Sequence, residues 1–271
     1  MPKEKKNNTN SKKITKIAIS WILYSIKILL GDEGIRRYII LHYFPNLTYS
    51  EPKILRTFNA FIQKGKTRKD KLIEIEKYLK SIEKLKKDIV VFTASNVQRN
   101  EYDIETHYQS YIVDNNNKNI YIIDPAFDKT KDNYMGIYYA EITHELIKPF
   151  FENKGYNINF VRLSNPAQTS NTDVFCQSWS LLILLQVLQN SSYEANIEYI
   201  MPKKEIDRFD IILNFYKKIF TDMPALQENL KVEYTGTIND SSSFEESLKF
   251  ELLSYNPVDI LMNMKKEDMQ E

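Results

Sequence analysis

The sequence predicts an α+β fold in which a central, mostly antiparallel sheet packs on a buried helix, with further helices flanking it. Residues 107–113 and 120–123 are rich in aromatic and β-branched side chains, and the polar segment between them has the composition of a turn, which is typical of a β-hairpin. Residues 179–188 are apolar on nearly every side, as in a helix buried within a domain. Amphipathic helical patterns at 64–87 and 203–221 supply the flanking helices.

Four segments are expected along the 271 residues. Residues 1–13 form a Lys/Asn-rich tail with little to pack, which we expect to be disordered. Residues 14–87 form a helical N-terminal extension, whose first apolar run is interrupted by Lys27 and is too short for a membrane span. Residues 88–260 form the main domain, and residues 261–271 form a frayed tail.

Composition excludes several classes of protein. The formal net charge is +1, so nothing global predicts a nucleic-acid partner. A single cysteine excludes a disulfide framework and fits a reducing compartment, so we expect a cytoplasmic location. With one Cys and 3 scattered His residues, the chain offers no metal-ligand set, and we expect no metal and no cofactor.

The hairpin carries the first two candidate functional residues. His107 opens the first strand, and Asp124 follows the second. With Asn115 and Asn116 at the centre of the turn, His107 pairs with Asp124 and their Cβ atoms lie about 5 Å apart on one face. Asp124 then accepts a proton from the imidazole and fixes its tautomer, whereas a slip of one residue would place the two side chains on opposite faces.

Cys176 is the third candidate, and it lies just before the apolar helix. If Asp173 is the N-cap, Cys176 falls in the first helical turn, where the helix dipole favours a thiolate. The negative charge of Asp173 opposes that effect. The chain therefore presents a base, an orienting carboxylate and a nucleophile in the order that a thiol hydrolase needs.

Each of these residues also has an ordinary structural interpretation. A lone cysteine in a helix is most often a small buried hydrophobic residue, an Asp at a strand end is usually a turn former, and a His at a strand start is usually a surface or half-buried polar group. The joint order and spacing favour the functional interpretation over the separate structural ones.

This arrangement resembles the ubiquitin-like-protein-specific protease and adenovirus protease family, and in particular its divergent versions in large DNA viruses. The similarity covers roughly residues 88–190. In that family a His opens one strand, an acid closes the adjacent strand about seventeen residues later, and a Gln before the Cys contributes to the oxyanion hole. His107 and Asp124 are seventeen residues apart, and Gln168 precedes Cys176. The resemblance implies catalytic roles for these four residues.

The chain departs from the family pattern at three positions. Tyr108 stands where the family usually has a Trp that covers the glycines of the substrate, and Gln177 stands where a Gly usually follows the Cys. Both are therefore candidate substrate-binding residues. Gln168 lies eight residues before Cys176, whereas the family spacing is commonly six, and Asn171 is a second candidate for the oxyanion donor.

The resemblance implies a cysteine protease that cleaves peptide or isopeptide bonds after small residues, such as Gly-Gly or Ala-Gly. Its implied partners are a protein substrate, either a viral structural precursor or a ubiquitin-like conjugate, and an activating protein, with no membrane partner. The implied locations are the host cytoplasm and the virion. Two alternatives remain open: an acetyltransferase with the same His-Asp-Cys layout, and a non-catalytic virion scaffold that keeps the fold.

Overall fold

The computed structural model describes residues 30–50, 68–85, 87–99, 104–128, 133–134, 146–168, 175–190, 198–199, 201–202 and 205–226. The chain divides into two compact units, Glu33–Lys203 and a second unit that combines Met1–Asp32 with Lys204–Glu271. The boundary expected near residue 88 falls inside the first unit. The tails expected at 1–13 and 261–271 lie outside the described residues.

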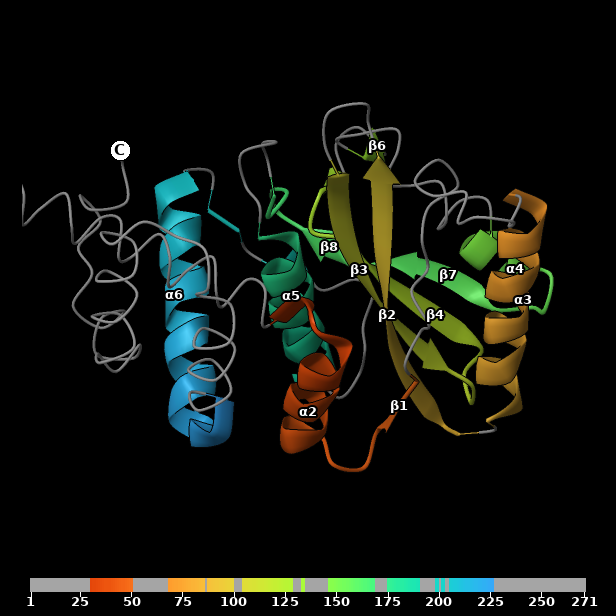
Figure 1. Cartoon of the computed structure of the whole chain (residues 1–271), viewed down its shortest axis with the longest axis horizontal. Helices are drawn as coiled ribbons and strands as arrows, with labels where there is room; N and C mark the ends of the chain where they lie inside the picture. The colour runs from red at the N-terminus through yellow and green to blue at the C-terminus, as the bar shows by residue number, and fades with distance from the viewer. Residues whose placement is uncertain are drawn as a thin grey trace, which may run out of the picture. The chain divides into compact units, whose positions relative to one another are not determined.

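The unit Glu33–Lys203 is built on a five-stranded sheet with the order β1-β2-β3-β4-β7 (Figure 1). Pairing is antiparallel from β2 to β4 and parallel at the two outer pairs, so the α+β class is confirmed and the sheet is mixed. The strands are β1 (Thr48–Tyr49), β2 (Ile89–Arg99), β3 (Ile104–Asp114), β4 (Asn119–Ile123) and β7 (Asn157–Phe160). Four short strands form two small pairs, β5 (Phe127–Asp128) with β6 (Asn133–Tyr134) and β8 (Arg162–Leu163) with β9 (Glu198–Tyr199).

Helices cover both faces of this sheet. Figure 1 shows α2 (Glu33–Tyr43) and α5 (Cys176–Gln189) on one side, and α3 (Arg68–Lys84) and α4 (Lys148–Glu152) on the other. The helical patterns predicted at 64–87 and 203–221 are confirmed as α3 and as α6 (Glu205–Asp222) of the second unit. In the described part of the chain, every helix is too short or too polar to cross a bilayer.

The core between the sheet and helices α3 and α4 is apolar and contains an aromatic stack. Phe92 of β2 lies against Tyr111 of β3, with ring centroids 4.6 Å apart and planes only 8° from parallel. Both side chains are fully buried. Tyr111 Oη also donates a hydrogen bond to Gln109 Oε1, so this stack is connected to the polar residues of β3.

Replacing Phe92 with alanine tests how much the aromatic stack contributes to the free energy of unfolding. We expect Phe92→Ala to lower the free energy of unfolding by about 3–5 kcal/mol, because the change removes buried apolar surface and leaves a cavity. Denaturant unfolding measures this loss. The control is Ile73→Ala on α3, whose side chain is 41% exposed and whose loss we expect to cost less than about 0.5 kcal/mol. Equal effects of the two substitutions would contradict this account of the core.

The hairpin has a longer turn than the sequence predicted. The observed register pairs Asp114 with Asn119, so residues 115–118 form a four-residue turn and the predicted two-residue turn is wrong. The Asp114 carboxylate accepts hydrogen bonds from the backbone N–H groups of Asn116 (3.1 Å) and Asn117 (3.0 Å). Lys118 takes the left-handed conformation, with φ of 53°. The hydrogen bonds from the turn N–H groups to the Asp114 carboxylate therefore set the length of the turn.

The register differs from the predicted one by two residues, and this preserves the face on which each side chain lies. The β3–β4 ladder ends where Ser110 pairs with Ile123, so His107 and Asp124 are not directly opposite each other as predicted. Because side chains alternate between the two faces of a strand, a shift of two residues leaves both on the same face. Their contact is diagonal rather than directly cross-strand.

Candidate active site

Helix α5 positions the single cysteine at its first residue. The helix runs from Cys176 to Gln189, which confirms the prediction that Cys176 lies in the first helical turn. The N-cap residue is Phe175, without a side-chain capping hydrogen bond, so the predicted cap at Asp173 is wrong. The side chain of Asp173 itself lies outside the described residues. No acidic side chain occupies the first turn of α5, so the positive end of the helix dipole faces the sulfur without an opposing charge from that turn.

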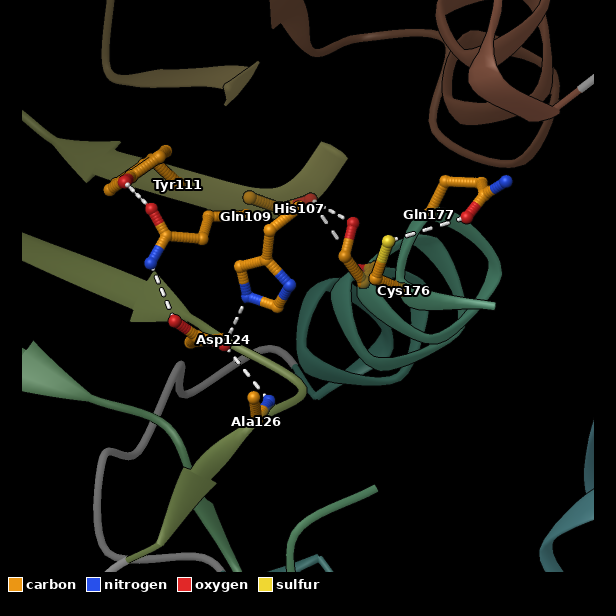
Figure 2. Close-up of polar contacts among 9 residues, drawn as sticks. His107, Gln109, Tyr111, Asp124, Ala126, Cys176 and Gln177 are labelled. Atoms are coloured by element: carbon orange, nitrogen blue, oxygen red, sulfur yellow. Dashed lines mark hydrogen bonds and ion pairs between the residues drawn. The ribbon is translucent and has the colours of Figure 1, made fainter. Parts of the chain in front are cut away.

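His107 and Asp124 meet in the interior. His107 Nε2 lies 2.8 Å from Asp124 Oδ1, and both side chains are buried. Asp124 Oδ1 also accepts the backbone N–H of Ala126 at 2.9 Å, which fixes the carboxylate immediately after β4. A carboxylate in this position accepts the Nε2 proton, which leaves Nδ1 as the ring nitrogen available for other chemistry. Figure 2 shows Nδ1 on the side of the ring that faces Cys176.

The charge state of His107 depends on both of its neighbours. Burial opposes the imidazolium form, but the Asp124 carboxylate and a hydrogen bond with the Cys176 sulfur outweigh it and raise the pKa of His107 to about 10. The imidazole therefore carries its proton at neutral pH. The structure thus brings thiol, imidazole and carboxylate into interaction range, and a protonated imidazole favours a thiolate beside it.

Two further residues of β3 continue this cluster, and neither was predicted from the sequence. Gln109 Nε2 donates to Asp124 Oδ2 at 2.5 Å, and Tyr111 Oη donates to Gln109 Oε1 at 2.7 Å (Figure 2). Gln109 and Tyr111 follow His107 at intervals of two, so all three side chains lie on one face of the strand. That spacing was visible in the sequence, and a polar residue at the second position of such a series is the signal that could have identified Gln109.

Removing the amide of Gln109 tests whether it orients the carboxylate. We expect Gln109→Leu to slow acylation of Cys176 by about 10-fold or more, because a hydrogen bond to a charged group contributes about 1.5–3 kcal/mol. The measurement is the rate of covalent adduct formation with an electrophilic peptide. Gln186→Leu, at an exposed position on α5, is the matched control. A folded Gln109→Leu variant that reacts at the wild-type rate would contradict this role.

Gln177 lies directly against the cysteine. The Cys176 thiol donates to Gln177 Oε1 with Sγ and Oε1 3.5 Å apart, and the Gln177 side chain is only 4% exposed. The amide therefore occupies space next to the sulfur that a glycine would leave open. In this orientation the amide oxygen faces the sulfur, and a half-turn of the amide would present its N–H groups to a thiolate.

Tyr108 directly follows His107 in the sequence, and Gln168 is bonded to the residue that follows Asp124. Tyr108 is half-buried, and the Arg36 guanidinium lies 5.4 Å from the centroid of its ring. The backbone N–H of Gln168 donates to the carbonyl of Pro125 at 2.9 Å, which holds the Gln168 backbone beside the residue that follows Asp124. Asn171, the second candidate for the oxyanion donor, lies outside the described residues.

The arrangement has the chemical parts needed for acyl transfer. His107 lies between an acid and a thiol, so it can move a proton between the sulfur and a substrate. Cys176 is the first residue of α5, and backbone N–H groups at the start of a helix can stabilise the negative charge of an oxyanion. Over the described ranges, no group of three or more His, Cys, Asp or Glu side chains is arranged to hold a metal ion.

The fold and the site together define an α+β chain with a buried thiol–imidazole–carboxylate cluster. No protein-family model matches the sequence, and no curated protein matches it. Among solved structures, the chain is similar to crystal structures of the Legionella pneumophila effector protein RavZ. One has a TM-score of 0.31 and 13% identity, covering 73% of this chain and 70% of that one. Another has a TM-score of 0.30 and 14% identity, covering 82% and 73%. Similarity this low carries no functional conclusion.

Proposed function

We propose that this chain is a cysteine protease in which Cys176 is the nucleophile, His107 is the general base and acid, and Asp124 orients the imidazole. The observation that carries the proposal is the buried His107, which is bonded to Asp124 at 2.8 Å through Nε2 and interacts with the Cys176 sulfur. A cysteine that served only as packing would not need a protonated imidazole beside it.

The proposed reaction has two stages. We propose that the proton of the Cys176 thiol resides on His107 Nδ1 before substrate binds, so the reacting form is a thiolate–imidazolium ion pair. The thiolate attacks the substrate carbonyl carbon, and the negative charge on the oxygen is met by the backbone N–H of Cys176. Gln168 is the proposed side-chain donor to the same oxygen. His107 then protonates the leaving amine, which leaves a thioester on Cys176. Water hydrolyses the thioester, with His107 accepting a proton from the water, and the sulfur leaves as a thiolate, which restores the starting thiolate–imidazolium pair.

The proposed substrates carry small residues before the scissile bond. Cys176 is only 3% exposed and His107 only 1%, so a substrate must bring its carbonyl through limited space to reach the sulfur. An extended segment ending in Gly-Gly or Ala-Gly fits that requirement, since it has little or no side-chain volume. Viral structural precursors and ubiquitin-like conjugates are the substrate classes that the sequence resemblance implies.

A peptide ending in Gly-Gly with a C-terminal electrophile tests the proposal. Because Cys176 is the single cysteine of the chain, intact-mass analysis assigns any thiol adduct to it. We expect one adduct on the wild type, none on Cys176→Ser, and a much slower reaction with a peptide ending in Leu-Leu. A folded wild type that forms no adduct would contradict proteolysis, and transfer of label from acetyl-CoA to Cys176 in the same preparation would indicate an acetyltransferase instead.

A further inference from the structure

Arg36 of helix α2 is a charged residue in the interior of the unit Glu33–Lys203. Its side chain is 0% exposed, which is rare for an arginine because burying a guanidinium is costly unless its N–H groups are bonded. Arg36 was not predicted from the sequence as a site residue. It lies well before the segment that resembles the protease family.

The guanidinium joins three elements of the fold. Nη1 donates to the backbone carbonyl of Gln177 at 2.7 Å, and Nη2 donates to the hydroxyl oxygens of Ser180 at 2.8 Å and Ser110 at 3.2 Å. The guanidinium also lies against the ring of Tyr108, with its central carbon 5.4 Å from the ring centroid. Two of the contacts are to α5, and two are to β3.

The identity of the contacted residues connects Arg36 to the candidate site. Gln177 directly follows Cys176, and Tyr108 directly follows His107. A single planar group therefore bonds to the neighbour of the thiol and packs on the neighbour of the imidazole. The hydroxyl groups of Ser110 and Ser180 lie 3.1 Å apart, so they join the same two elements beside it.

We propose that Arg36 is a positioning residue that holds the first turn of α5 against β3 so that the Cys176 sulfur stays within bonding reach of His107. The inference rests on the proposed function. The guanidinium of Arg36 holds its N–H groups at fixed angles in one plane. It can therefore donate to the Gln177 carbonyl and to the two serine hydroxyls at the same time. A lysine ammonium has the charge but not the planar fork or the flat face that packs on an aromatic ring.

The thiolate content of the protein at neutral pH tests this role. Thiolate absorbs in the ultraviolet where the thiol does not, and subtracting the Cys176→Ser spectrum isolates the signal of the single cysteine. We expect Arg36→Met and Arg36→Lys to lower the thiolate signal about 10-fold, because a displaced sulfur loses its pairing with the imidazolium. Arg37→Met, which changes the exposed next residue of α2, should keep the wild-type signal.

The outcomes separate the two claims. Thermal unfolding of each variant establishes whether that variant is folded. If Arg36→Met fails to fold, Arg36→Lys provides the test, because lysine keeps the positive charge and most of the aliphatic part of the side chain. Loss of thiolate in a folded Arg36 variant supports the inference, since a residue that only stabilised the fold would leave the thiolate unchanged. A wild-type thiolate signal in folded Arg36→Lys overturns the inference alone. A wild type without thiolate overturns the proposed ion pair and the inference with it.

Discussion

Replacing His107 with alanine lowers the rate of Cys176 acylation by about 10⁴-fold at neutral pH, at the upper end of what general acid–base catalysis contributes. His107 is the group that takes the thiol proton, and it is held by Asp124 at 2.8 Å. Without the imidazole, the sulfur has neither a base to receive its proton nor a cation to pair with as a thiolate. The measurement is single-turnover acylation by a Gly-Gly thioester or ester.

The control for this prediction is a second histidine of the same chain. His42 lies at an exposed position on α2, where it packs edge-on against Tyr43 with ring centroids 5.2 Å apart. We expect His42→Ala to acylate at the wild-type rate. If His107→Ala also kept a rate within about 10-fold of the wild type, general base catalysis by His107 would be excluded.

We expect Asp124→Asn to lower the pH above which the rate of Cys176 acylation falls. In the wild type the pKa of His107 is about 10, because the Asp124 carboxylate and the Cys176 sulfur outweigh the opposing effect of burial. Replacing the carboxylate with a neutral amide of the same shape removes the largest favourable contribution and leaves the burial, so the pKa of His107 falls. When that pKa lies about two pH units below the assay pH, the imidazolium fraction and the rate fall about 100-fold.

The rate of Cys176 acylation measured across the pH range checks this prediction. The wild type should stay active until the pH approaches about 10, and the Asp124→Asn variant should lose activity from near neutral pH upward. Asp114→Asn is a control that changes a carboxylate in the hairpin turn rather than in the candidate site. Parallel pH profiles for the wild type and Asp124→Asn would show that the carboxylate does not set the charge of His107.

The raised pKa of His107 also has a consequence for stability. Its folded-state pKa of about 10 lies above the ordinary value of 6.5, so the imidazolium stabilises the folded state fully below pH 6.5, and this stabilisation is lost as the pH rises through about 10. Asp124→Asn removes most of that pH-dependent contribution. The difference in unfolding free energy between the two proteins should therefore shrink as the pH rises through this window.

The sequence was sufficient for the local features of the site because each has a short-range signal. Strand-forming residues on either side of a polar segment predicted the hairpin, and the apolar run predicted the buried helix with Cys176 in its first turn. The alternation of side chains along the two strands predicted that His107 and Asp124 lie on the same face. The predicted register was wrong by two residues because the Asp114 carboxylate accepts hydrogen bonds from the N–H groups of the turn, which makes the turn longer. Such hydrogen bonds between a side chain and the backbone compete with the preference of Asn for the centre of a two-residue turn.

The long-range features could not be predicted from the sequence. Arg36 bonds to Gln177 across a separation of 141 residues, and Ser110 bonds to Ser180 across 70. No local periodicity encodes such contacts, because they exist only once α2 and α5 pack on the same sheet. The short strand β1 pairs with β2 for the same reason, and this pairing places part of the expected N-terminal extension within the unit that holds the site.

The most direct test of the central claim is the protonation state of His107, followed by ¹⁵N NMR of the imidazole ring. The chain contains 3 histidines, so the His107→Ala spectrum assigns the signal. If thiol, imidazole and carboxylate form one site, His107 is an imidazolium at neutral pH, loses its proton near pH 10, and does so at lower pH in Cys176→Ala. A His107 that titrates near its ordinary pKa of 6.5, unchanged by Cys176→Ala, would contradict the account.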